Sequence, residues 1–214
     1  MIPVGAILAL ADELAIVSTL AAIREDYIRR YRPRARAEAA HFARGSVEQR
    51  VRNAALARRE NGRKHKHQWR IPSALLEEFA ERLIARLDEI KCASSFTALL
   101  AIVDAAKLRG VSGLTVYDTA ARIGAGQGLE PQEVYLHAGT RKGAVRLGWN
   151  VRRSSIPLRE IPKELAGLSP SEIEDLLCSY SRYFGTGAKK FLPTNCDEDT
   201  SSGCGPGRGV PPAC

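Results

Sequence analysis

The chain has 214 residues, of which 44% are hydrophobic, 26% charged and 6% aromatic. This length and composition suit one folded domain with appendages, and they exclude a chain that is disordered throughout. The first apolar stretch, residues 2–11, ends at two acidic residues and is too short to cross a bilayer. It also lacks the basic start of a secretory signal, so we expect a cytoplasmic protein with no membrane partner.

The net charge of +8 is concentrated in one segment, residues 24–70, which we call the basic flank. This flank holds fifteen basic and five acidic residues, whereas the rest of the chain is slightly acidic. Clustered arginines suit a polyanion, because their guanidinium forks match phosphate oxygens and displace counterions. The alternative is a solvated helical face without a partner. We favour nucleic acid, and more specifically DNA, as the partner.

Apolar residues at helical spacing predict an all-α fold. Ser46 with Gln49 and Ser169 with Glu172 have the spacing of capping boxes at helix starts. The second box precedes an apolar stripe of Ile173, Leu176, Leu177 and Tyr180. Cys92 and Cys178 lie in apolar helical surroundings, and we expect them to be small core residues. Alternation and prolines in residues 149–161 predict an extended arm or a small hairpin strand. The predicted helices span residues 4–23, 35–60 with a break at 45–46, 73–91, 95–110, 115–123, 131–138, 141–147 and 170–185.

We expect three regions along the chain. Residues 1–60 form N-terminal helices that carry the basic flank, and residues 61–185 form the helical core domain. Residues 186–214 are rich in Gly, Pro and Ser and form a disordered tail. An apolar stripe on the first helix needs a partner surface, and a homodimeric scaffold is one alternative function. This stripe consists of Ile7, Leu10, Leu14 and Val17.

Glycines join short predicted helices between residues 110 and 148. Residues 110–113, Gly-Val-Ser-Gly, together with the preceding helix resemble a helix-hairpin-helix module, although that module has two glycines around a single apolar residue. The resemblance implies contacts to a nucleic-acid backbone without base reading. The alternative is that the glycines only end core helices. The GAGQG run follows no strand, so we expect no dinucleotide cofactor.

Residues 63–70 interleave basic side chains with two histidines and a tryptophan. In an extended segment His65, His67 and Trp69 share one side, where they can contact phosphates and stack on a base. A loop with a buried Trp69 is the alternative. Two histidines do not make a metal site unless His41 or His137 converges with them, so we expect no metal and no other cofactor. The residues predicted to bind nucleic acid are Arg52, Arg58, Arg59, Arg63, Lys64, His65, Lys66, His67, Trp69, Arg70, Gly110, Gly113, Thr140, Arg141 and Lys142.

An enzyme is the other alternative, acting on a phosphorylated substrate or RNA. His137 is the candidate general acid or base, and Arg141 is the candidate oxyanion ligand. A buried, hydrogen-bonded pair of Tyr117 and His137 would explain the same residues without catalysis. The catalytic candidates are His137, Tyr117, Asp118 and Arg141, with Arg122 and Thr140 nearby in sequence.

Three strings are similar to those of a bacterial family of uncharacterised proteins. They are GRKHKHQWRIP, LTVYDTAARIGAGQGLEPQEVYLHAGTRKGA and LSPSEIEDLLC, within residues 60–178. The resemblance implies that these segments belong to one domain. It implies no particular chemistry.

Overall fold

The computed structural model describes residues 19–185, which divide into two compact units. Of the described residues, unit 1 contains 19–32 and 133–185, and unit 2 contains 33–132. The sequence predicted a boundary near residue 60, but the contacts divide the chain after residues 32 and 132. Residues 47–55 pack on later helices of unit 2. Residues 33–60 of the predicted N-terminal region therefore belong to the same unit as residues 61–132 of the predicted core. The strings of the family resemblance fall in both units.

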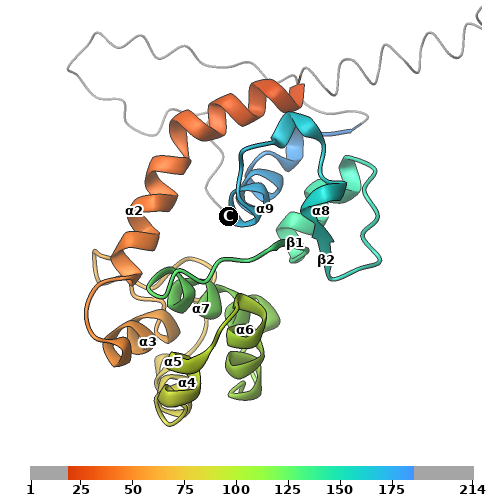
Figure 1. Ribbon diagram of the computed structural model, residues 1–214. Coiled ribbons are helices and arrows are strands. Elements are labelled where there is room, and N and C mark those ends of the chain that lie inside the picture. Colours follow the sequence, from red (N-terminus) through yellow and green to blue (C-terminus); the bar gives the residue numbers. More distant parts are fainter. Residues whose placement is uncertain (1–18, 186–214) are drawn as a thin grey trace, which may run out of the picture. The chain divides into compact units, whose positions relative to one another are not determined.

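Unit 2 is built from helices only, as the sequence predicted (Figure 1). Helix α3 packs against α4 and α7, and α6 packs against α7. Residues from each of these helices are fully buried, among them Val51, Phe79, Leu99 and Ile123. The helices are α2 (Arg32–Phe42), α3 (Val47–Ala55), α4 (Ser73–Ile84), α5 (Leu87–Cys92), α6 (Phe96–Ala105) and α7 (Gly113–Ala125).

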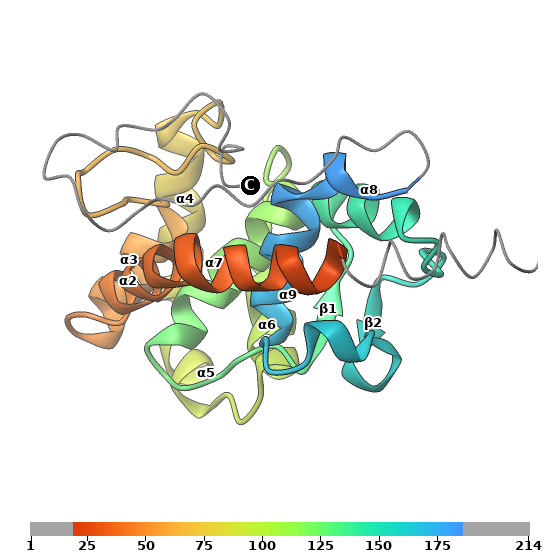
Figure 2. The ribbon, with the colours of Figure 1, turned by 90° about the horizontal axis from the view of Figure 1, so that it is seen from above.

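Unit 1 combines helices with a two-stranded antiparallel sheet, whose strands are separated in the chain by α8 (Figure 2). Helix α9 contacts α8 and β1, and its buried face is the predicted stripe of Ile173, Leu176, Leu177 and Tyr180. Residues 19–30 are helical and add Leu20, Ile23 and Tyr27 to the same core. The other elements are β1 (Glu133–Tyr135), α8 (Ala138–Arg146), β2 (Ser155–Pro157), α9 (Pro170–Ser179) and 3-10 turns at Leu158–Glu160, Lys163–Leu165 and Ser181–Tyr183.

Both predicted capping boxes are present. The Ser46 side chain accepts a hydrogen bond from the Gln49 amide, and the Gln49 side chain accepts one from the Ser46 amide. Ser169 and Glu172 make the same reciprocal pair, and Pro170 occupies the first turn of α9. Each box satisfies amide groups that would otherwise lack partners at a helix start, which fixes where α3 and α9 begin.

Three expectations for local structure were wrong. Residues 73–91 do not form one helix, because Arg86 leaves helical geometry and its guanidinium donates to the Ile102 carbonyl at 2.8 Å. Residues 131–138 are not helical either, since Val134 pairs with Ile156 between two strands and both side chains are buried. Cys92, expected as a small core residue, is exposed.

Two expectations fall on residues that lie outside the described range: the apolar stripe of residues 7–17 and the tail of residues 186–214. Within residues 19–185, no helix has both the length and the apolar composition needed to span a membrane.

The close contact of α8 and α9 requires a glycine at position 143. A Cβ atom there would collide with the backbone of Leu177 in α9. We expect Gly143→Ala to lower the free energy of unfolding by roughly 1–3 kcal/mol, because the two helices must separate. Urea denaturation followed by circular dichroism measures the change.

Gly113→Ala is the matched control, because no atom lies within 4 Å of its added Cβ. Its effect should stay below about 1 kcal/mol and favour the folded state. Equal denaturation midpoints for Gly143→Ala and the unmodified chain would contradict the tight helix contact.

Candidate functional site

Residues 63–70, which we call the basic loop, follow a tight turn after α3. The Arg59 amide donates to the Arg63 carbonyl at 3.0 Å, and the His65 amide donates to the Ala57 carbonyl at 2.8 Å. Gly62 sits at the turn with a φ of +73°, which favours glycine. The turn therefore directs the basic loop back over unit 2 before α4 begins at Ser73.

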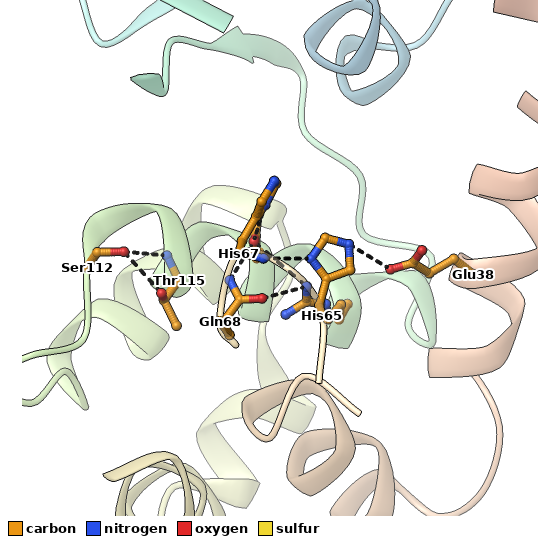
Figure 3. Close-up of polar contacts among 8 residues, drawn as sticks. Glu38, His65, His67, Gln68, Ser112 and Thr115 are labelled. Carbon is orange, nitrogen blue, oxygen red and sulfur yellow. Dashed lines mark hydrogen bonds and ion pairs between the residues drawn. The ribbon is translucent and has the colours of Figure 1, made fainter. Parts of the chain in front are cut away.

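Gln68 anchors the basic loop to α7. Its side chain is completely buried, with Nε2 donating to Asp118 Oδ2 at 2.7 Å. Arg122 Nη2 donates to Gln68 Oε1 at 3.2 Å. Asp118 and Arg122 lie one helical turn apart, so both ends of the amide are satisfied by the same face of α7. Figure 3 labels Gln68 and draws its hydrogen bonds as dashed lines.

The two histidines of the basic loop lie beside the same carboxylate (Figure 3). His67 Nδ1 is 3.3 Å from Asp118 Oδ2. The His65 ring lies 4.8 Å from the His67 ring, and its Nδ1 accepts from the His67 amide at 3.4 Å. On the opposite side of the ring, His65 Nε2 is 3.5 Å from Glu38 of α2. The four side chains come from α2, the basic loop and α7.

The protonation states of this cluster follow from burial and charge. Burial lowers the pKa of His65 to about 3, and the positive charges of Arg122 and His67 add to the effect. Burial by itself would raise the pKa of Asp118, but hydrogen bonding from His67 and the charge of Arg122 outweigh it and lower that pKa. At neutral pH, His65 is a neutral base and Asp118 is an anion.

Arg122 is the buried cation of the cluster, with 8% of its surface exposed. Burial lowers its pKa, but an arginine remains charged at neutral pH. Its guanidinium lies over the Phe42 ring at 5.2 Å and 3.7 Å from Asp118 Oδ2. Among the described residues, its Nη1 atom has no hydrogen-bond partner.

The other side of the basic loop faces solvent. Trp69 is 61% exposed, the largest value among the large hydrophobic residues that the structure describes. The guanidinium of Arg70 lies over its ring at 4.9 Å. Arg63 and Lys66 are exposed as well. The interpretation in which Trp69 is buried was therefore wrong.

Many arginines of the basic flank are neutralised by carboxylates. Arg52 pairs with Glu81 at 2.8 Å, and Arg58 approaches Glu77 at 3.5 Å. Within residues 19–185, by contrast, no carboxylate lies within 4.0 Å of Arg59, Arg63 or Arg70. Lys64 donates to the Ile71 carbonyl at 2.7 Å. Among the predicted residues of unit 2, the arginines without a carboxylate partner therefore lie in or beside the basic loop. The flank's other carboxylate pairs are Arg24–Glu25, Arg29–Asp26, Arg30–Asp26, Arg32–Glu172 and Arg44–Glu60.

The glycine turn resembling a helix-hairpin-helix joins α6 to α7. Gly110 has a φ of +98°, and Ser112 caps α7 by accepting from the Thr115 amide at 3.1 Å. Gly110 and Gly113 are both exposed. An exposed glycine turn thus joins two packed helices, and the first of them ends earlier than predicted, at Ala105.

The candidate catalytic residues are divided between the two units. Tyr117 is buried in unit 2 against Phe96, with ring centroids 5.6 Å apart. His137, Thr140, Arg141 and Lys142 belong to unit 1. His137 precedes α8 and stacks on Tyr135 at 6.4 Å. Arg141 donates to the carbonyls of Leu136, Val151 and Arg153, which gives it a structural role.

His41 does not approach the two histidines of the basic loop as a ligand, because its Nε2 contacts the Arg58 carbonyl at 2.9 Å. The third group beside them is Asp118, which no spacing rule in the sequence pairs with these histidines. No family model, curated protein or solved structure matches the chain.

Replacement of Gln68 tests the anchor of the basic loop. We expect Gln68→Leu to lower the free energy of unfolding by about 1–3 kcal/mol, because Asp118 and Arg122 each lose a buried hydrogen bond. Urea denaturation measures the loss. Gln132→Leu, at an exposed glutamine of the same unit, should change stability by less than about 0.5 kcal/mol. Equal effects of the two substitutions would contradict the anchor.

Proposed function

We propose that the protein binds nucleic acid through the basic loop of unit 2, with little or no sequence preference. The observation that carries this proposal is the exposed Trp69 with Arg70 over its ring. An exposed indole costs solvation free energy unless a partner covers it, and bases stack on such rings. A base exposed for stacking is characteristic of a single-stranded region or a loop.

The charges around Trp69 support the same proposal. Arg59, Arg63 and Arg70 lack a carboxylate within ion-pair distance among the described residues, so binding phosphates requires no internal ion pair to break. Arg52 and Arg58 contribute less, because Glu81 and Glu77 already neutralise them. The surface proposed for binding is thus smaller than the basic flank.

The exposed glycine turn at residues 110–113 is the candidate for an additional phosphate contact. Its amide groups at the start of α7 can donate to an anion, except for the Thr115 amide that Ser112 already satisfies. Thr140, Arg141 and Lys142 belong to unit 1 and form no part of this proposal. The enzyme hypothesis centred on His137 and Arg141 has less support, because carbonyl groups occupy the Arg141 guanidinium.

A salt series on the full chain tests the proposal. We expect affinity for a labelled single-stranded oligonucleotide, measured by fluorescence anisotropy, to fall steeply between about 50 and 200 mM salt. Trp69→Ala should weaken binding roughly 5- to 100-fold, and Trp69→Phe should weaken it much less, because a phenyl ring retains a stacking face.

Two matched substitutions test how much the positive charge beside Trp69 contributes to binding. Arg70→Gln should weaken binding and reduce the slope of log affinity against log salt by about one. Arg82→Gln removes the same charge from an exposed residue of α4 that pairs with Glu78, so its effect should be smaller. Affinity that is independent of salt, or unchanged in Trp69→Ala, would overturn the proposal.

A further inference from the structure

The geometry points to a binding site for a divalent transition metal such as Zn²⁺, with His65, His67 and Asp118 as ligands. Their ligand atoms all lie within 4.8 Å of one another, and all three side chains are partly buried (Figure 3). Two imidazole nitrogens and one carboxylate oxygen form a ligand set that such metals favour. The site goes beyond the proposed function, since it needs no nucleic acid.

The distance between His67 and Asp118 fits two ligands of one metal ion. Zn²⁺ bonds of about 2.0–2.1 Å in a tetrahedron place neighbouring ligand atoms about 3.3 Å apart. His67 Nδ1 and Asp118 Oδ2 are separated by 3.3 Å. A charge-assisted hydrogen bond between the same atoms is usually shorter, at about 2.7–2.9 Å. The separation therefore matches one edge of a metal tetrahedron.

His65 is oriented to present Nδ1. Its Nε2 faces the Glu38 carboxylate at 3.5 Å, while Nδ1 accepts only a long contact from the His67 amide at 3.4 Å. A carboxylate that holds the distal nitrogen of an imidazole is the usual support behind a metal-bound histidine, because it fixes the tautomer and ring orientation. Glu38 is therefore a positioning residue for His65.

Asp118 is held in place by Gln68 and Arg122. Its Oδ2 accepts from Gln68 and lies 3.7 Å from Arg122, and a carboxylate has lone pairs for further partners. The positive charge of Arg122 opposes a cation, whereas the negative charges of Asp118 and Glu38 favour one. When both imidazoles bind as neutral ligands, the two carboxylates and Arg122 together carry one net negative charge, which favours a cation.

Titration of the full chain with Zn²⁺, after chelator treatment and against a chromophoric competitor, tests the site. We expect His67→Gln and Asp118→Asn each to weaken Zn²⁺ binding by at least about tenfold, and Glu38→Gln by roughly tenfold. His41→Gln is the matched control from α2 and should bind as the unmodified chain does, because His41 contacts a carbonyl instead. Circular dichroism verifies that each variant is folded.

Cysteine thiolates elsewhere in the chain also attract Zn²⁺, so Co²⁺ is used as a spectroscopic probe. Visible bands of tetrahedral cobalt without the near-ultraviolet band of thiolate ligation are expected, and they should be lost in His67→Gln. Undiminished affinity in both His67→Gln and Asp118→Asn, or a thiolate spectrum, would overturn the metal site. Trp69→Ala should retain the affinity for Zn²⁺, which distinguishes failure of this site from failure of nucleic-acid binding.

Discussion

The hydrogen bonds of Gln68 with Asp118 and Arg122 determine which side chains of the basic loop lie against α7 and which face solvent. A charged carboxylate and a charged guanidinium inside a small helical unit are costly unless each finds partners. Gln68 supplies one hydrogen bond to each and is completely buried in doing so. Because Gln68 is fixed, its neighbours are fixed as well: His67 lies against Asp118, and Trp69 lies in solvent.

Helix α7 supplies the rigid side of this arrangement. Asp118 and Arg122 are one turn apart on it, and Val116, Ala120 and Ile123 are buried among the other helices of unit 2. The start of α7 is fixed by Ser112, which accepts from the Thr115 amide. A loop that is bonded to such a helix has few conformations open to it. Without that anchor, a loop of lysines, arginines and histidines would lack this order.

The sequence predicted what depends on neighbours along the chain and missed what depends on distant ones. Capping boxes at Ser46 and Ser169 and the buried stripe of α9 are local patterns, and the structure confirms them. The strand Glu133–Tyr135 is only three residues long and exists because it pairs with a segment some twenty residues later. The approach of His67 to Asp118 joins residues 51 positions apart, so no spacing rule indicated it.

The net charge of residues 24–70 shows that this segment is rich in arginine. It does not show which of these arginines lack a carboxylate partner. Residues 24–70 carry a large excess of arginine, yet carboxylates from α4, α9 and the flank itself neutralise many of these side chains. Those glutamates are remote in sequence, such as Glu172 for Arg32 and Glu81 for Arg52. The summed charge of a segment counts its cations. It does not show which of them pair with carboxylates once the chain has folded.

The two sides of the basic loop carry separate chemistry. His65, His67 and Gln68 contact Glu38 and Asp118, whereas Trp69 and Arg70 contact each other in solvent. A metal ion on the first side would join the loop to α7, and it would restrict the conformations of the residues that carry the indole. Order gained on one side would lower the entropy lost when the other side binds a ligand, so the two proposed sites would be thermodynamically coupled even though they share no atoms.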